Sequence, residues 1–191
     1  MNDLLNSFFN FVSLSEALKK IERFKDQVYW IDYPKLKRYE SVADHSWRLA
    51  LLVILVEDRL SKSINLQKAL NFAILHDLAE AVAGDSHPMG KDGTGKSTYY
   101  SIKNLSKKKF DKENKAIKEM LNILPKSENE KMYKLWLEYE KRESFESKIV
   151  KALDAIECML QVYEYRKSKM FKNHLDFTIE YGTRNSSSIH L

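Results

Sequence analysis

The sequence is short of glycine, proline and cysteine. Its 191 residues include five glycines, three prolines and one cysteine. A single cysteine excludes an internal disulfide, and we interpret Cys158 as a buried structural thiol because it lies inside an apolar helical pattern. Few chain-breaking residues and almost no alternating strand pattern favour helices. We therefore expect an all-α fold.

Long hydrophobic runs are also lacking, and we expect no leader segment. The longest apolar run, from Leu49 to Val56, is far shorter than the ~20 residues that cross a bilayer. Acidic Asp3 stands where a signal peptide would carry positive charge, and no small-residue cleavage site follows it. We expect a cytoplasmic protein with no membrane partner.

Charge of one sign is not strongly in excess. The net charge is +5, but 27 acidic residues accompany 32 basic ones. The lysine cluster 107–109 has no interleaved stacking aromatics, so we interpret it as a solvated helix face and expect no nucleic-acid partner. The length suits one domain, 1–191, with a core of about 13–169 and a loose tail over 170–191.

Capping signals divide the chain into successive helices. Five of the expected starts have a residue that can cap them, namely Ser13, Ser41, Asn65, Ser127 and Ser144, and Ser13 and Ser127 can form capping boxes with Glu16 and Glu130. Gly84 can end the third helix. The expected helices span about 13–24, 41–60, 65–84, 111–125, 127–142 and 144–169.

The stretch GKDGTGKST, residues 90–98, matches the phosphate-loop pattern in its first eight letters. Such a loop cradles phosphates between a strand and a helix. Here a helical phrase precedes it, so we interpret the stretch as a glycine-rich insertion. It is left open that Lys91 or Lys96 touches a substrate phosphate as part of a mobile lid. For His87, a loop-surface position is favoured over a pocket position.

Candidate metal ligands stand at core-facing positions of three expected helices. His76 and Asp77 are adjacent in ILHDLAEAVAGD, His45 lies one turn into its helix, and Asp154 interrupts an apolar stripe. A buried carboxylate is costly unless a metal or a salt partner keeps it ionised. Two imidazoles and two carboxylates suit one divalent ion of manganese, cobalt, magnesium or iron. The alternative is a hydrogen-bonded His-Asp pair without a metal.

Two further carboxylates follow on the same segment. Glu80 lies four residues after His76, so it projects from the same helical face about one turn further on. Asp85 follows Gly84, where the helix is expected to end. We predict that Glu80 and Asp85 are catalytic, and that one of them orients a water molecule and handles its proton.

The phrases around these residues resemble a known family. ESVADHSWRLA, HDLAEAVAGD and LWLEYEKRESFESKIVKALDAIECMLQ are similar to the 5'-deoxynucleotidase group of the HD-domain phosphohydrolases. The family motif H...HD...D is filled by His45, His76 with Asp77, and Asp154. This resemblance, over about residues 14–167, implies a helical fold, one divalent ion and removal of phosphate from nucleoside 5'-monophosphates, with the two further carboxylates assisting the water. It also suggests a homodimer.

One pair departs from the family pattern. Where that group has Arg-Trp or Gly-Trp in its substrate pocket, the sequence has Tyr29 and Trp30. Trp30 is expected either to contact the substrate or to pack as a core or lid aromatic. The candidates to replace the missing arginine are Arg23, Lys25, Lys35 and Arg38.

The expected function is metal-dependent removal of phosphate from (deoxy)nucleoside 5'-monophosphates. A first alternative keeps the hydrolase and changes the substrate to a nucleoside triphosphate, a guanosine alarmone or a cyclic nucleotide. A second is a non-enzymatic helical module whose glycine-rich loop binds ATP or whose lysines bind nucleic acid. The reaction products distinguish the two hydrolase hypotheses. The binding module predicts ATP affinity that is lost in Lys96→Ala and unchanged in His45→Ala.

Overall fold

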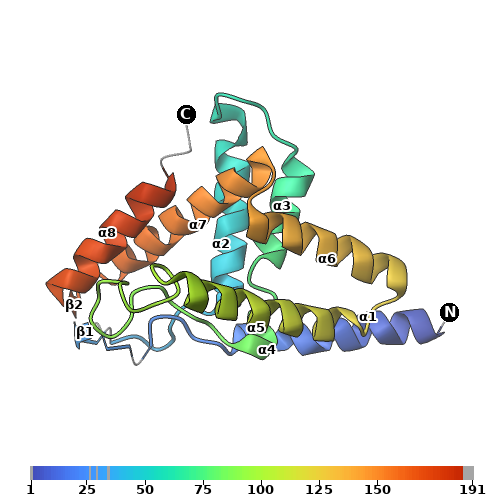
Figure 1. Ribbon diagram of the computed structural model, residues 1–191, viewed down its shortest axis with the longest axis horizontal. Helices are drawn as coiled ribbons and strands as arrows, with labels where there is room; N and C mark the ends of the chain where they lie inside the picture. Colours follow the sequence, from blue (N-terminus) through green and yellow to red (C-terminus); the bar gives the residue numbers. More distant parts are fainter. Residues whose placement is uncertain (1, 26, 29, 34, 187–191) are drawn as a thin grey trace.

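The computed structural model describes residues 2–25, 27–28, 30–33 and 35–186, which form a bundle of helices with one small antiparallel sheet (Figure 1). The expected all-α class is confirmed. The elements are α1 (Asn2–Ser15), η1 (Glu16–Lys19), β1 (Trp30–Asp32), α2 (Val42–Val56), η2 (Glu57–Arg59), α3 (Leu66–Leu75), α4 (Glu80–Ala83), α5 (Lys103–Leu121), α6 (Lys126–Lys141), α7 (Phe145–Glu164), β2 (Lys169–Met170) and α8 (Lys172–Ser186). Among the described residues, no helix combines the length and apolar character that a membrane span requires.

Side-chain caps fix the starts of three helices. At α2, Ser41 accepts a hydrogen bond from the Asp44 backbone N–H, and the Asp44 carboxylate accepts one from the Ser41 N–H. Asn65 caps α3 by accepting from a first-turn N–H, and Ser144 caps α7 reciprocally with Ser147. Each cap satisfies N–H groups that a helix start leaves unpaired. These predicted starts are confirmed.

α2, α3 and α7 pack around a shared core (Figure 1). Leu49 and Val53 of α2, Phe72 of α3, and Ile149 and Val150 of α7 are all fully buried. Burying such a set is the main favourable term for this arrangement. The three helices thereby hold fixed the faces that carry the candidate ligands.

The helix predicted over 65–84 is interrupted. α3 ends at Leu75, and α4 begins at Glu80. Between them, the N–H groups of Leu78 and Glu80 donate to the carbonyls of Leu75 and Asp77, three residues back rather than four, at 3.1 and 3.0 Å. This tighter pairing is the geometry of a 3₁₀ turn. His76 and Asp77 therefore lie in a turn between two helices.

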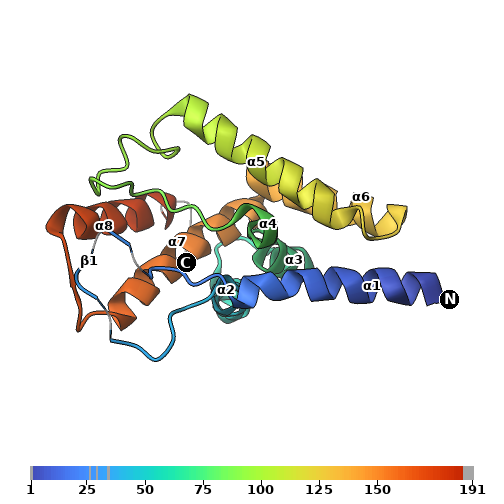
Figure 2. The ribbon, with the colours of Figure 1, turned by 90° about the horizontal axis from the view of Figure 1, so that it is seen from below.

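Residues 172–186 form α8, so the prediction of a loose tail is wrong for them. α8 packs along α7 in both views of the ribbon (Figures 1 and 2). Its inner face buries His174, Phe177 and Thr178, at the spacing of a helical stripe. The segment is polar on average, so its composition does not indicate this buried stripe. Residues 187–191 of the expected tail lie outside the described residues.

Three other helix starts were predicted too late. α1 begins at Asn2 and not near residue 13, and α5 begins at Lys103 and not near residue 111. α6 begins at Lys126, directly after Pro125, and has no side-chain cap, so a capping box at Ser127 does not form. Pro125 occupies the N-cap position, and the Ser127 hydroxyl donates to Glu128 instead of capping the helix.

Candidate metal centre

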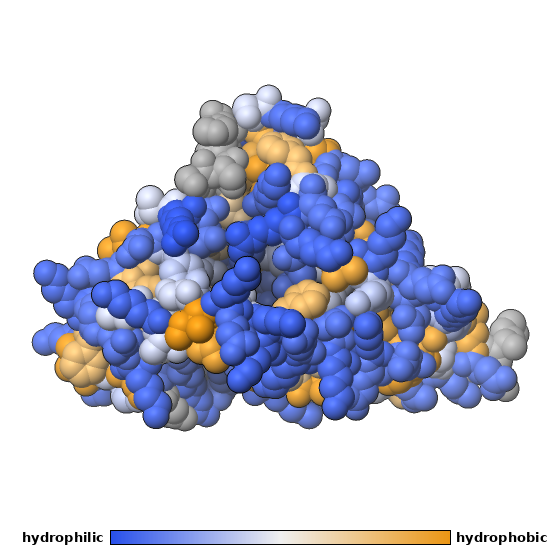
Figure 3. Space-filling model, viewed as in Figure 1, coloured by the Kyte–Doolittle hydropathy of each residue, from blue (hydrophilic) through white to orange (hydrophobic). Residues whose placement is uncertain are grey.

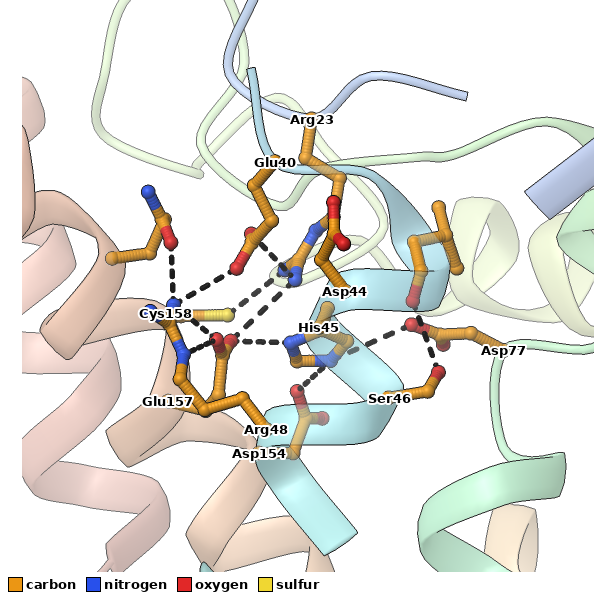
Figure 4. A network of polar contacts seen from close by, with 12 residues as sticks. Arg23, Glu40, Asp44, His45, Ser46, Arg48, Asp77, Asp154, Glu157 and Cys158 are labelled. Carbon is orange, nitrogen blue, oxygen red and sulfur yellow. Dashed lines mark hydrogen bonds and ion pairs between the residues drawn. The ribbon is translucent and has the colours of Figure 1, made fainter. Parts of the chain in front are cut away.

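Four side chains from three parts of the chain meet in the interior, and Figure 4 shows three of them, His45, Asp77 and Asp154. His45 comes from the first turn of α2, His76 and Asp77 from the turn after α3, and Asp154 from α7. His45 Nε2 lies 3.2 Å from His76 Nε2 and 3.2 Å from Asp154 Oδ1. Asp77 Oδ2 lies 3.1 Å from His76 Nε2 and 3.6 Å from His45 Nε2. The structure thus brings all the predicted ligands together.

The second ring nitrogen of each histidine has an acceptor. His45 Nδ1 is hydrogen bonded to the Glu157 carboxylate, and His76 Nδ1 lies 3.1 Å from the Ala73 carbonyl oxygen. An acceptor at Nδ1 favours a proton there and leaves the Nε2 lone pair facing inward. Two such lone pairs and two carboxylates would repel one another unless a cation lies between them. The residues present therefore fit a metal ion.

The kind of donor indicates the kind of ion. The nearest ligand atoms of His45, His76 and Asp154 all lie within 4.8 Å of one another. Nitrogen and carboxylate oxygen donors without a thiolate suit manganese, cobalt, magnesium or iron. The donor set agrees with a divalent ion and does not select one of these metals.

Neighbouring charges keep the two candidate carboxylate ligands ionised. Burial alone would raise the pKa of Asp154, but Lys151, whose Nζ lies 2.7 Å from Asp154 Oδ2, and His45 lower it well below its usual range. Burial also opposes ionisation of Asp77, yet His76 and His45 lower its pKa below the usual range. Both side chains are therefore ready to bind a cation.

A buried ion-pair network lies behind His45, and sequence reasoning missed it (Figure 4). Glu157 accepts a hydrogen bond from Arg48 Nε at 2.6 Å and lies 3.5 Å from Arg23 Nη1. Arg48 and Arg23 also donate to the two oxygens of Glu40, at 2.8 and 3.1 Å. Burial would raise the pKa of Glu157, but His45 and the two arginines lower it to about 2. Glu157 therefore stays ionised and holds the His45 ring.

This carboxylate also sets the protonation of His45. Burial and Arg23 disfavour the imidazolium, but Glu157 and Asp154 outweigh them and raise the pKa of His45 to about 9. A proton and a metal ion therefore compete for the same nitrogen, His45 Nε2.

Helical spacing was the available signal for the missed residues. Glu157 lies three residues after Asp154, Lys151 lies three before it, and Arg48 lies three after His45. Residues three apart share a helix face. Charged residues that share a helix face with a buried metal ligand are therefore candidates to hydrogen bond or ion pair with the ligands.

A cavity, partly open to solvent, adjoins the cluster between α7, α8 and the segment 85–89. Its polar lining includes Asp77, Asp154, Glu80, Asp85 and Arg23, and its apolar lining includes Phe24, Met89, Val162 and Phe177. A pocket with a few charged groups and an otherwise apolar lining is typical of small-molecule sites.

Both predicted catalytic carboxylates line this first cavity. Glu80 is only 6% exposed, and its Oε2 has no hydrogen-bond partner among the described residues. Burial, with Asp77 and Asp85 nearby, raises the pKa of Glu80 well above its usual range. Asp85 follows Gly84, whose φ of +74° ends α4. A buried carboxyl group with an unused oxygen beside the candidate ligands is suited to hold a proton.

A second cavity, open to solvent, lies between α5, α6 and α8. Its basic lining residues are Lys103, Lys107, Lys109, Arg142, Lys151 and Arg184. Figure 3 shows this face of the molecule as mostly hydrophilic and hollowed near its centre. The residues that line both cavities are Asp77, Glu80, Tyr99, Lys109, Lys151 and Tyr181. The candidate metal centre therefore borders both cavities.

Of the residues predicted to bind substrate, some line a cavity and others do not. Arg23 lines the first cavity. Trp30 is 5% exposed, its Nε1 donates to the Phe24 carbonyl at 2.8 Å, and its ring packs on Tyr165 at 6.0 Å, so it is a core aromatic that lines neither cavity. Its neighbour Tyr29 lies outside the described residues.

The other candidates for the missing arginine lie away from the first cavity. Lys25 pairs with a neighbouring glutamate, Arg38 pairs with Asp44, and Lys35 is exposed. These placements leave Arg23 as the candidate that borders the first cavity.

The glycine-rich stretch packs against α8. Gly93 and Gly95 have positive φ angles of +73° and +69°. A Cβ atom on Gly93 would lie 2.4 Å from the His174 ring, and one on Gly95 would lie 2.4 Å from Phe177. These glycines therefore serve a tight turn and a close helix contact. Lys96 is exposed and lines neither cavity.

The surroundings of this stretch also differ from those of a phosphate loop. Within the described segment 80–103, α4 precedes the stretch and α5 begins only at Lys103, so no strand leads into it and no helix follows it directly. The sequence interpretation of a glycine-rich insertion fits this geometry.

Two single-residue expectations need correction. His87 was favoured as a surface residue, but it lines the first cavity, where burial lowers its pKa. Cys158 is only partly buried and lines the same cavity, with Arg23 Nη2 at 3.1 Å from its sulfur. Burial nevertheless raises the pKa of Cys158 far above its usual range, so the thiol is a poor nucleophile.

Comparison with known proteins agrees with this geometry. A family model described as HD domain matches residues 16–190. The chain is 33% identical over 162 residues to 5'-deoxynucleotidase HDDC2 of Xenopus laevis, covering 84% of this chain and 70% of that protein. It is 32% identical over 160 residues to the Homo sapiens protein of the same name, covering 83% and 68%. A crystal structure from Magnetospirillum magnetotacticum, described as a predicted metal-dependent phosphohydrolase, shares the fold with a TM-score of 0.73 at 22% identity, over 98% of this chain and 87% of that one.

Proposed function

The chain belongs to the HD-domain family, and from that membership we propose that it removes phosphate from (deoxy)nucleoside 5'-monophosphates with the help of a divalent metal ion. It is a metal-dependent nucleotide phosphohydrolase. The products would be a nucleoside and inorganic phosphate.

One observation carries the proposal. The inward-facing Nε2 atoms of His45 and His76 meet the carboxylates of Asp77 and Asp154, directly beside the buried carboxyl group of Glu80. A structural salt bridge would need neither the facing imidazoles nor the adjoining cavity. The same arrangement is what hydrolysis of a phosphate ester requires, namely a bound cation next to a proton acceptor.

The proposed roles of the ligands are simple. His45, His76, Asp77 and Asp154 would hold one ion, and Glu157 and the Ala73 carbonyl would fix the two imidazole rings. A divalent ion there supplies a positive charge that offsets the phosphate charge and makes water more acidic. Manganese, cobalt, magnesium and iron are the metals to test.

Glu80 is the proposed acceptor for the proton of the attacking water. Its Oε2 has no hydrogen-bond partner among the described residues, and its raised pKa makes the carboxylate form a stronger base, so it is suited to take up a proton during the reaction. As the water oxygen bonds to phosphorus, the bond between phosphorus and the nucleoside oxygen breaks, and that oxygen takes up a proton. Asp85, at the edge of the first cavity, would orient the water or pass that proton on.

The first cavity is proposed to hold the nucleoside. Phe24, Met89 and Phe177 supply apolar surface for a base, and the Arg23 guanidinium lies on the side of the candidate metal centre. Arg23 is held by Glu40, so its charge is fixed in place. A fixed cation orients a phosphate at little entropic cost.

A nucleotide panel tests this function. Phosphate release is measured from deoxynucleoside and ribonucleoside 5'-monophosphates with each of the four metals, for the unchanged protein, Asp77→Ala and the exposed control Asp58→Ala. We expect turnover with at least one metal, its loss in Asp77→Ala and its retention in Asp58→Ala. No release with any metal, or full activity in Asp77→Ala, would contradict the proposal.

The second cavity favours one alternative substrate. Its basic rim, including Lys103, Lys107 and Arg184, has room for further phosphates beyond the one at the cluster. A nucleoside triphosphate is therefore the second candidate. Release of pyrophosphate or triphosphate would support it, and release of phosphate from monophosphates alone would exclude it.

A further inference from the structure

Lys109 differs from the rest of its lysine cluster. Lys107 and Lys108 are exposed, as expected for a solvated helix face, but the Lys109 side chain is only 26% exposed. It turns inward from α5 and lines both cavities at the wall that they share with Asp77 and Glu80. The interpretation of the whole cluster as a solvated face is therefore wrong for this residue.

The Lys109 ammonium group is held in place from two sides. It donates a hydrogen bond to Glu113, one turn further along α5, and Glu113 is itself buried. Its Nζ also lies 5.2 Å from the centre of the Tyr99 ring, and the Tyr99 hydroxyl donates to the Ser86 carbonyl at 2.8 Å. A lysine on a solvent-exposed helix face needs neither the buried carboxylate nor the aromatic contact. A fixed ammonium has lost its conformational freedom before a ligand arrives.

The neighbouring cations have different roles. Lys151, which also lines both cavities, binds the candidate ligand Asp154, and Arg23, which lines the first cavity and not the second, binds Glu40. The carboxylate that holds Lys109 is Glu113, which is outside the ligand cluster. Glu113 accepts one of three ammonium hydrogens, so further donors of Lys109 can serve a ligand at the shared wall.

We infer that Lys109 donates to an oxygen of the phosphoryl group and offsets its negative charge, with Glu113 as its positioning residue. This inference rests on the proposed function. A phosphoryl group at the candidate metal centre would have oxygens directed away from the ligands, and Lys109 is a fixed cation at the wall shared by the two cavities whose own carboxylate partner is not a candidate ligand. Lysine binds phosphate as a point charge, and one well-placed donor contributes strongly when charge develops in the transition state.

Two readouts test this role. The variants are Lys109→Met, Lys109→Arg and Glu113→Gln, and the matched control is Lys108→Met, at an exposed neighbour that lines neither cavity. The first readout is the affinity of the metal-loaded protein for inorganic phosphate by calorimetry. The second is kcat and KM for a nucleoside 5'-monophosphate, with metal content and thermal melting measured in parallel.

For Lys109→Met we expect phosphate affinity to fall by roughly 10-fold or more and kcat by roughly 100-fold or more, since one donor to a charged transition state has about that effect. Metal content stays unchanged. Lys109→Arg retains part of both, Glu113→Gln loses about 10-fold in kcat because the ammonium is less well placed, and Lys108→Met behaves as the unchanged protein.

Phosphate affinity and kcat of Lys109→Met that both match Lys108→Met would overturn the inference. Loss of metal from Lys109→Met would overturn it too, because the residue would then support the ligands. Should that variant fail to fold, Lys109→Gln replaces it, and misfolding of both would show a structural role and overturn it. Lys109-dependent phosphate binding without turnover of any monophosphate would support the inference while the proposed function fails.

Discussion

The Nε2 atoms of His45 and His76 lie 3.2 Å apart, and each imidazole has its Nδ1 engaged by an oxygen outside the cluster. The two oxygens, from the Glu157 carboxylate and the Ala73 carbonyl, thereby influence the candidate metal centre without being part of it. The acceptor behind each ring decides which nitrogen carries the proton, and hence which lone pair a cation meets. The two acceptors are of different kinds, a carboxylate for His45 and a backbone carbonyl for His76.

The first prediction concerns the carboxylate behind His45. Glu157→Gln should lower metal affinity by about 10- to 100-fold, because the neutral amide orients the ring less firmly and makes it less basic. Metal titration of the metal-free protein measures this. Glu164→Gln is the control, since Glu164 also pairs with Arg48 but is 55% exposed in its side chain and does not contact His45. Equal affinities in the two variants would contradict the prediction.

The second prediction concerns Glu80. Glu80→Gln should lower kcat by roughly 100- to 10,000-fold, the usual contribution of a general acid or base, while the bound metal stays at its normal level. Steady-state kinetics with metal analysis separates these effects. The exposed Glu119 on α5 supplies the control Glu119→Gln. Retained turnover would exclude Glu80 as the proton acceptor.

The third prediction concerns the start of α2. Ser41→Ala removes the reciprocal cap with Asp44 and should reduce the free energy of unfolding by about 1 kcal/mol, the usual value of such a cap. Thermal and denaturant unfolding measure it, with the exposed Ser61→Ala as control. A stability equal to that of the control would mean that the cap contributes nothing.

The fourth prediction concerns the glycine-rich stretch. Gly93→Ala should destabilise the protein by roughly 1 to 3 kcal/mol, because it adds strain at a positive φ and a clash with the His174 ring. Lys96→Ala should change neither stability nor phosphate release, since Lys96 is exposed and lines neither cavity. Melting curves and kinetics of both variants provide the check. Loss of nucleotide binding in Lys96→Ala would restore the phosphate-loop hypothesis.

Sequence patterns predicted the helix starts that depend on a few neighbouring residues. The caps at Ser41, Asn65 and Ser144 are read from a few neighbouring letters, and the structure contains them. The break between Leu75 and Glu80 could not be read in this way, because both halves of the segment favour a helix. Tertiary contacts favour the tight turn there, and they are not visible in local propensity.

Long-range relationships were the second limit. The pairing of His45 with Glu157 joins residues from α2 and α7, and the inward position of Lys109 depends in part on Tyr99, which precedes α5. The sequence gives the type of each residue and its helix face, but not the partner from another helix. α8 was missed for a related reason, since its stripe becomes evident only against the glycine turn that it covers.

The wall shared by the two cavities has a consequence for how catalysis would end. A blind pocket forces two products to leave in a fixed order through one mouth. Here Asp77 and Glu80 line two cavities, so under the proposed function a nucleoside and an inorganic phosphate would not have to leave through the same cavity. Turnover would then proceed without either product waiting for the other, and each product would inhibit the enzyme independently.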